Sequence, residues 1–182
     1  MIVGRYFGFD PRTVGSGNIG MTNVARAGGK GAAALTFAGD LGKGFIPVIV
    51  ARTILGVVPP ALAIVGFAAF VGAIASIFLG FKGGRGVATS VGVWLGLAPA
   101  PLSIALAVFI VIVATTRTVS LASISAAITL PPAVAILRCS RAYLLLAIVM
   151  TALVLLRHQE NIGRLIRGEE PKIGSAKKGN PS

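Results

Sequence analysis

Five long apolar stretches, separated by short polar segments, dominate the chain. They cover roughly residues 31–51, 57–80, 86–115, 119–137 and 142–156. A helix of about 20 apolar residues crosses the hydrocarbon core of a bilayer, because each residue advances the helix by about 1.5 Å. The pattern therefore predicts an all-α, polytopic integral membrane protein.

The stretch 86–115 is too long for a single simple crossing, and it contains Pro99 and Pro101. Proline removes a backbone donor and clashes with the preceding helical turn. We therefore expect residues 98–101 to form a turn between two antiparallel helices. The first of these, residues 87–97, would be about 17 Å long and so short for a full span. This division gives six predicted membrane helices.

With six crossings, three polar clusters fall on one side of the membrane: residues 10–30, 80–86 and 157–178. Thirteen of the 17 lysines and arginines lie on that side, three lie on the other, and Lys43 lies inside an apolar stretch. Cytoplasmic loops of membrane proteins are enriched in Lys and Arg. The clusters are therefore expected to face the cytoplasm, and the protein to lie in the plasma or inner membrane of a bacterium.

Composition excludes several classes of function. The net charge of +12 is spread over short loops rather than gathered in one stripe, which argues against nucleic-acid binding. Cys139 and His158 are the only cysteine and histidine, so neither an internal disulfide nor a Cys/His metal site is expected.

Asp40 and Lys43 are the charges within an apolar stretch, and we expect them to pair.

The glycine-rich part of the first cluster runs from Val14 to Asn23 and contains three glycines at the spacing of a dinucleotide-binding fingerprint. That fingerprint requires a preceding strand and a parallel sheet, whereas an apolar helix follows here, so the match is interpreted as accidental. Glycine-rich backbone can still direct N–H groups at an anion, and Ser16 and Asn18 add side-chain donors. The alternative interpretation is a polar turn that caps a helix.

The other two clusters also combine charges with helix ends. Residues 80–89 place Lys82 and Arg85 in a glycine-rich turn before a helix, which suits a phosphate but is equally typical of a basic membrane loop. If the last helix continues past Arg157, His158 and Asn161 share one of its faces. A lone histidine at a helix end is more often a solvated or capping residue than a catalyst.

Together these clusters resemble the bacterial acyl-phosphate-dependent glycerol-3-phosphate acyltransferases of the PlsY type. The resemblance covers nearly the whole chain and rests on four ordered segments. They are Gly15–Arg26 with Asp40, Lys43 and Gly44; Phe81–Thr89; Ser120–Ile124; and Arg157–Leu165 with Gly168 and Glu170–Lys172.

The resemblance implies acyl transfer from acyl phosphate to the 1-hydroxyl of glycerol 3-phosphate, giving lysophosphatidic acid and inorganic phosphate in phospholipid biosynthesis. It implies no cofactor or metal, contact with membrane lipid, and a functional link to the enzyme that makes acyl phosphate. By position, it assigns catalytic roles to Ser16, His158 and Asn161. It assigns substrate or phosphate binding to Ser16, Asn18, Arg26, Lys82, Gly83, Gly84, Arg85 and Ser123.

The resemblance also implies a seven-helix fold, so the family's first helix is expected to lie before Ile2. We expect residues 1–172 to form a single membrane-embedded domain and residues 173–182 a flexible basic tail.

Three positions depart from the family pattern: Ala73 replaces a histidine, Ser76 a proline and Arg85 a lysine. Arg85 keeps the charge but exchanges a point donor for a planar fork.

Two alternatives to an active acyltransferase remain: a small anion transporter or channel, and an inactive truncated relative. A transporter would be expected to carry polar motifs on both sides of the membrane, and the clusters gather on one. The acyltransferases that use histidine followed four residues later by aspartate are excluded, because Ile162 stands at that distance from His158. The sequence leaves open whether His158 or the departing phosphate accepts the hydroxyl proton.

Overall fold

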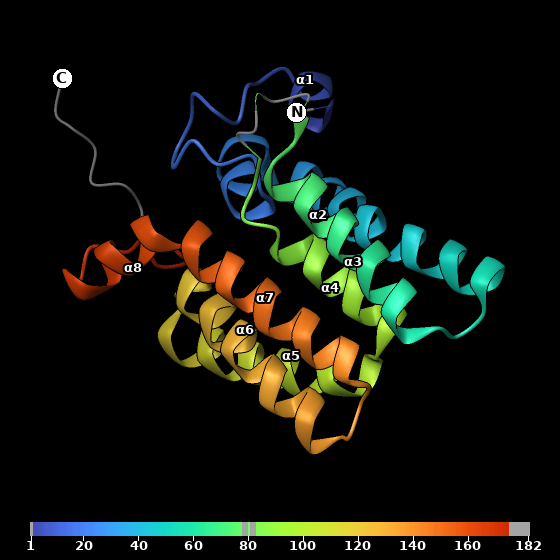
Figure 1. Ribbon diagram of the computed structural model, residues 1–182. Helices are drawn as coiled ribbons and strands as arrows, with labels where there is room; N and C mark the ends of the chain where they lie inside the picture. The colour runs from blue at the N-terminus through green and yellow to red at the C-terminus, as the bar shows by residue number, and fades with distance from the viewer. Residues whose placement is uncertain (1, 78–79, 81–82, 175–182) are drawn as a thin grey trace, which may run out of the picture.

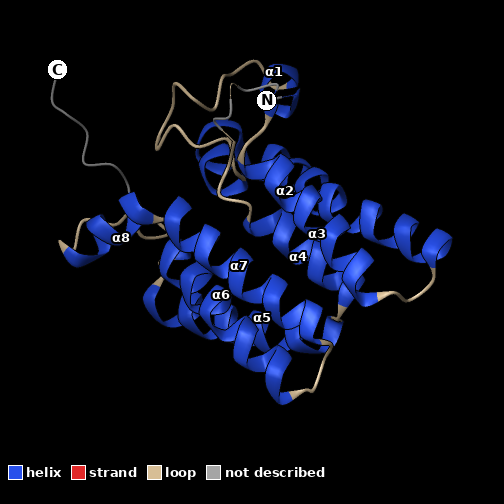
Figure 2. Cartoon of the chain, in the orientation of Figure 1, coloured by secondary structure: helices blue, strands red, loops and turns tan. Residues whose placement is uncertain are grey.

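The computed structural model describes residues 2–77, 80 and 83–174, and every regular element among them is a helix (Figure 2). The all-α prediction is confirmed. The helices are α1 (Ile2–Tyr6), α2 (Met21–Leu55), α3 (Pro59–Ile74), α4 (Val87–Leu97), α5 (Pro99–Thr116), α6 (Val119–Ile136), α7 (Arg141–Arg157) and α8 (Gln159–Ile166).

Three helices, α2, α5 and α6, are long and apolar enough to cross a bilayer, and the bent pair α7–α8 adds a fourth candidate. Helices α3 and α4 are apolar but shorter. The expected short helix at residues 87–97 is present as α4. The chain is therefore a multi-pass membrane protein, while the count of six crossings stays a prediction.

Several boundaries differ from those expected. Helix α2 begins at Met21 rather than at residue 31, and it is kinked at Gly29, whose φ of 74° and ψ of −173° are not helical. Helix α3 ends at Ile74 instead of continuing to residue 80. The turn expected at residues 98–101 is reduced to Ala98, because proline is tolerated in the first turn of a helix and Pro99 opens α5.

The helices form two groups that meet along α7. Helices α2, α3 and α4 pack together, α5 packs on α6 and α6 on α7, and α7 contacts both α3 and α4 (Figure 1). The buried core lies at this junction and includes Phe70, Trp94, Leu146 and Met150. Large apolar side chains on the outer faces are exposed, as expected where lipid is the solvent.

Glycines bring α2 and α4 into direct backbone contact. A Cβ atom at Gly92 would overlap the carbonyl oxygen of Leu41, and one at Gly44 would overlap that of Thr89. Small residues allow this close approach between membrane helices. The contact fixes the short helix α4, whose N-terminus carries the second polar cluster.

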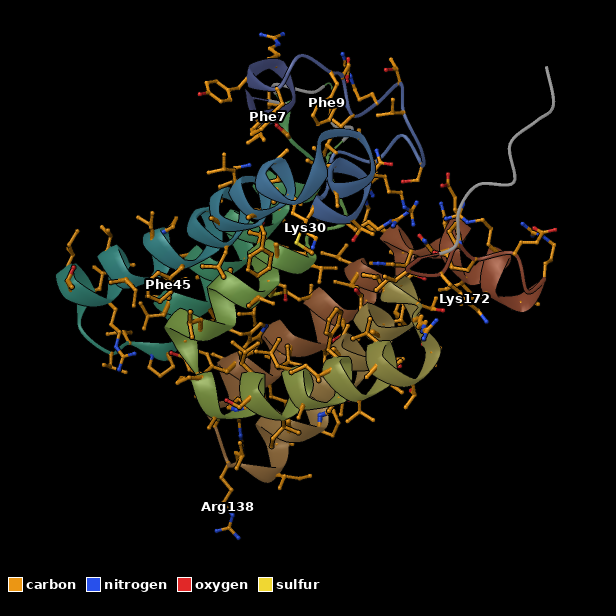
Figure 3. The ribbon with its side chains drawn as sticks, turned by 180° about the vertical axis from the view of Figure 1, so that it is seen from behind. Phe7, Phe9, Lys30, Phe45, Arg138 and Lys172 are labelled. Atoms are coloured by element: carbon orange, nitrogen blue, oxygen red, sulfur yellow. The ribbon has the colours of Figure 1, made fainter. Side chains whose placement is uncertain are left out.

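The polar clusters gather at one end of the bundle. Figure 1 shows the loop before α2, the N-terminus of α4 and helix α8 at that end, with the turns after α2, α4 and α6 at the other. Lys172 and Arg138 mark the two opposite ends (Figure 3). The shared end expected for the three clusters is therefore observed.

The intramembrane pair is also observed. Lys43 Nζ lies 2.8 Å from Asp40 Oδ1, and the two residues are one helical turn apart on α2. The prediction that they pair with each other is confirmed. Their pairing explains how the apolar part of α2, residues 31–51, tolerates two charges.

Candidate active site

The chain bends sharply at His158, where the third cluster begins. Helices α7 and α8 meet at 61°, so α8 does not continue α7 as the shared-face interpretation assumed. His158 is the cap between the two helices and is only 2% exposed. Asn161, in the first turn of α8, is equally buried.

The ring of His158 is held by its own helix. Its Nδ1 atom lies 2.8 Å from the carbonyl oxygen of Val154. A carbonyl oxygen can only accept, so Nδ1 carries the proton in this contact. In the neutral ring, Nε2 is then left with a lone pair that can accept a hydrogen bond.

A buried carboxylate, Glu170, ties Asn161 to Arg164. Asn161 Nδ2 donates to Glu170 Oε1 over 2.5 Å, and Arg164 Nε donates to Oε2 over 2.7 Å. Only 8% of the Glu170 side chain is exposed. Burial raises the pKa of this carboxyl, but its contacts with Ser120, Asn161 and Arg164 outweigh burial and leave the pKa below its usual value. Glu170 is therefore an anion among cations.

Arg85 lies beside this group, in the segment that precedes α4. Burial lowers the pKa of its guanidinium, while the nearby charge of Glu170 raises it. The charge of Arg85 also acts on His158. An arginine remains protonated under such conditions, so Arg85 contributes a half-buried positive charge close to His158.

The glycines of the second cluster seat this loop. A Cβ at Gly83 would overlap the carbonyl oxygen of Ala73 at the end of α3, which explains why glycine stands there. Gly86 has a φ of 76° and caps α4. Arg157 Nη2 donates to the carbonyl oxygen of Gly83 over 2.6 Å, and its Nε donates to that of Gly84 over 3.3 Å. The end of α7 is thereby joined to the loop that carries Arg85.

The first cluster borders the second. A Cβ at Gly84 would lie 3.6 Å from Ile19 Cγ1 and 3.8 Å from Asn18 Oδ1. Asn18 Oδ1 accepts from the backbone N–H of Gly20 just before α2. Ser16, two residues earlier, is exposed. Loops separated by some sixty-five residues in sequence thus lie next to each other, with room for little more than a methyl group between them.

The remaining predicted site residues are placed less tightly. Ser123 lies in α6 one turn beyond Ser120 and is buried. Its hydroxyl donates to the carbonyl oxygen of Val119. Arg26 is exposed on α2, and no hydrogen bond or ion pair joins it to another of the described residues. Lys82 and most of the predicted tail, residues 175–182, lie outside the described residues.

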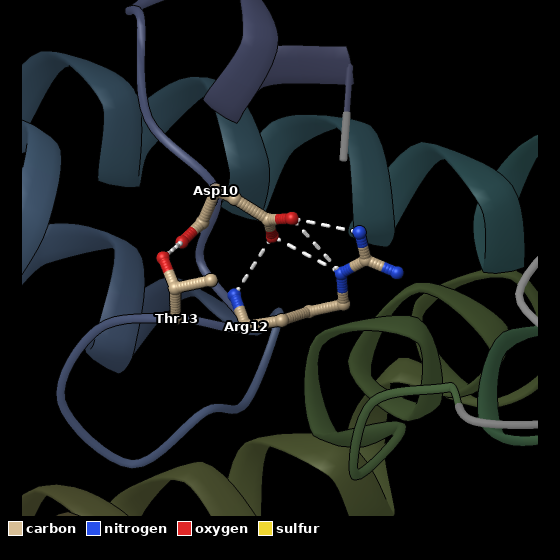
Figure 4. A network of polar contacts seen from close by, with 3 residues as sticks. All are labelled: Asp10, Arg12 and Thr13. Carbon is tan, nitrogen blue, oxygen red and sulfur yellow. Dashed lines mark hydrogen bonds and ion pairs between the residues drawn. The ribbon is translucent and has the colours of Figure 1, made fainter.

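Asp10, which precedes the glycine-rich part of the first cluster, forms hydrogen bonds with Arg12 and Thr13. Arg12 approaches both carboxylate oxygens of Asp10, with Nη2 at 2.7 Å from Oδ2, and Thr13 Oγ1 donates to the Asp10 carbonyl (Figure 4). These hydrogen bonds lower the pKa of Asp10 to about 2. So weak a base, already held by Arg12, is poorly suited to accept a proton from a substrate.

A family model described as glycerol-3-phosphate acyltransferase matches residues 1–168. The chain belongs to this family. A curated glycerol-3-phosphate acyltransferase of Geobacter sulfurreducens is 48% identical over 173 residues, covering 95% of this chain and 89% of the relative. One of Thioalkalivibrio sulfidiphilus is 46% identical over 169 residues, covering 93% and 83%.

Two crystal structures of PlsY (YgiH), described as an integral membrane glycerol 3-phosphate acyltransferase, share the fold. The glycerol 3-phosphate form aligns with a TM-score of 0.91 and 40% identity over 95% of this chain and 86% of that one. The lysophosphatidic acid form aligns with a TM-score of 0.89 and 39% identity. The chain is accordingly a membrane enzyme of the glycerol-3-phosphate acyltransferase type, and the resemblance drawn from its motifs is confirmed.

Sequence reasoning missed two residues of this candidate site that hold its other members in place. Glu170 was matched as part of a motif but given no role, although it joins Asn161 to Arg164. Arg157 likewise received no role, although it holds the glycine loop. Both residues lie within the matched segments, which marked them as candidates. Only the folded chain shows which carbonyl and amide groups their side chains reach.

Proposed function

We propose that the enzyme transfers an acyl group from acyl phosphate to the 1-hydroxyl of glycerol 3-phosphate. The products are lysophosphatidic acid and inorganic phosphate. The observation that carries the proposal is the buried His158, whose Nε2 has no hydrogen bond to another described residue and which feels the charge of Arg85. Membership in the glycerol-3-phosphate acyltransferase family supports the acceptor substrate.

The reaction needs little more than positioning. Acyl phosphate is a mixed anhydride, so its carbonyl carbon is already activated toward attack. The hydroxyl oxygen of glycerol 3-phosphate forms the new ester bond, the bond from the carbonyl carbon to the phosphate oxygen breaks, and the proton leaves with the phosphate as hydrogen phosphate. Holding two reactants in this geometry can supply about 7 to 11 kcal/mol of the barrier.

His158 orients the attacking hydroxyl in this proposal. Its Nδ1 is committed to the Val154 carbonyl, so the ring cannot turn freely and Nε2 has a fixed direction. A hydroxyl that donates to Nε2 presents its oxygen lone pairs to the acyl carbon. Asn161 Oδ1 is buried without a hydrogen-bond partner among the described residues, and it offers an acceptor for a second hydroxyl of glycerol 3-phosphate.

Cations and glycine amides hold the phosphates. Arg85 and the N-terminus of α4 are suited to a doubly charged phosphate, since both are positive and partly shielded from water. Ser16, Asn18, Arg26 and Ser123 keep their proposed binding roles at the same end, and the role of Lys82, which lies outside the described residues, stays a proposal from the sequence. The excess of basic residues at this end supports a site that faces the cytoplasm, with the enzyme in the bacterial inner membrane.

Donor choice tests the proposal. Purified protein in detergent or proteoliposomes is given labelled glycerol 3-phosphate with either palmitoyl phosphate or palmitoyl-CoA, with EDTA in both reactions. We expect lysophosphatidic acid from palmitoyl phosphate, with one phosphate released per product, and at least about 100-fold less from the thioester because the phosphate loops lack their ligand. Equal turnover of the CoA thioester, or loss of activity in EDTA, would overturn the proposal.

A further inference from the structure

One buried amide, that of Asn23, organises the whole first cluster. Asn23 is 3% exposed and lies in the first turn of α2. Its Nδ2 lies 2.7 Å from the carbonyl oxygen of Pro11, 3.0 Å from that of Val14 and 2.8 Å from that of Asn18. Three points of the loop between residues 11 and 18 are thus tied to a single side chain.

The other end of the same amide reaches Ser16. The backbone N–H of Ser16 donates to Asn23 Oδ1 over 2.9 Å. Because three carbonyls surround one end of the amide and an N–H faces the other, only one orientation of the group satisfies all four contacts. The network therefore requires both the donor and the acceptor of asparagine.

Gly15 leaves the space that this contact needs. It adopts a φ of 59°, and a Cβ atom built on it would overlap Asn23 Oδ1. A side chain at residue 15 would displace the oxygen that holds Ser16. The neighbouring residues Asn18 and Ile19 pack on Gly84, which adjoins Arg85, so a shift of this loop is transmitted to the border of the phosphate site.

We propose that Asn23 is a positioning residue of the acyltransferase: its amide fixes the loop so that the hydroxyl of Ser16 is held at the substrate. The inference rests on the proposed function through the role given to Ser16. Asn23 itself is buried behind the loop and contacts loop backbone. Its contribution to the reaction therefore passes through Ser16.

Two glycine substitutions test the geometry of the loop while Asn23 itself stays unchanged. Gly15→Ala introduces both an unfavourable positive φ and the overlap with Asn23 Oδ1. Gly8→Ala introduces a similar φ of 74° in the same N-terminal segment, but a Cβ there has nothing within 4 Å. The second variant is thus a matched control for backbone strain.

We expect Gly15→Ala to lower kcat by about 10-fold to 100-fold, since a shift of about 1 Å in a reacting group can cost about 100-fold. Gly8→Ala should stay within about twofold of wild type. Both are measured at equal amounts of folded protein with the better of the two acyl donors. Equal losses of kcat in the two variants would overturn the proposal. The comparison of the two variants is valid with either acyl donor, so it does not depend on the donor proposed above.

A double-mutant cycle tests whether Asn23 acts through Ser16. Asn23→Asp keeps the acceptor for the Ser16 N–H and removes the donors to the three carbonyls. In the wild-type background we expect a loss in kcat of about 10-fold or more, and in the Ser16→Ala background a further loss of less than about threefold, because coupled groups are not additive. Full multiplication of the two effects would contradict the proposal. If Ser16→Ala leaves too little turnover for the cycle, the glycine pair decides.

Discussion

Replacing Arg85 with alanine should nearly abolish acyl transfer while leaving the protein folded and inserted. Arg85 is half-buried and its charge acts on His158, so its loss would remove the proposed phosphate ligand from a partly desolvated site. Removing one partner of such a charged contact costs about 2 to 5 kcal/mol, which corresponds to about 30-fold to several-thousand-fold in kcat/KM. The measurement is kcat/KM at equal amounts of folded protein in the same membranes.

Two further variants define what Arg85 does. Arg141→Ala removes an exposed arginine at the other end of the bundle and should leave kcat/KM near the wild-type value. Arg85→Lys should retain much of the activity, because lysine keeps the positive charge and can serve as a point donor to a phosphate. Wild-type activity in Arg85→Ala would mean that this residue only contributes to the charge bias of the loops.

Changing His158 to asparagine should lower kcat by about 100-fold or more, because losing the group that orients the attacking hydroxyl misplaces a reacting atom, and a shift of about 1 Å can cost about 100-fold. The asparagine amide can occupy the place of imidazole Nδ1 and donate to the carbonyl oxygen of Val154, which His158 contacts at 2.8 Å. Nothing then stands at the position of Nε2. The substitution therefore removes the proposed acceptor while preserving the contact that holds the residue in the fold.

His158→Gln provides the complementary variant. Its longer side chain can place an oxygen near the position of Nε2 but gives up the contact with Val154. If hydrogen-bond acceptance is what the reaction requires, glutamine should retain more activity than asparagine at the same melting temperature. Asparagine with wild-type kcat would rule out a role for Nε2 and leave orientation of the hydroxyl to another group.

Much of the fold could be predicted from sequence because lipid makes the pattern simple. Apolar length placed α6 and α7 almost to the residue, and prolines 99 and 101 with the glycines before residue 87 delimited α4. The boundaries that failed depend on contacts with distant parts of the chain. Helix α3 stops at Ile74 although the apolar run continues, and at this end Gly83 lies against the carbonyl oxygen of Ala73.

The site was predicted as a set of residues rather than as a network. Motif order identified His158, Asn161 and Arg85, and the structure brings these three around Glu170. No proline or glycine marks the bend between α7 and α8, so the sequence favoured a continuous helix there. A glutamate beyond the last helix would ordinarily be read as exposed, and only tertiary packing reveals Glu170 as buried.

The central claim is that these loops form one site for glycerol 3-phosphate. A crystal structure of this chain with glycerol 3-phosphate bound tests that claim most directly. We predict that the 1-hydroxyl lies about 3 Å from His158 Nε2. A second hydroxyl should meet Asn161 Oδ1, with a phosphate on the side of Arg85 and the α4 N-terminus. Glycerol 3-phosphate bound at the other end of the bundle, or with its 1-hydroxyl directed away from His158, would contradict the account.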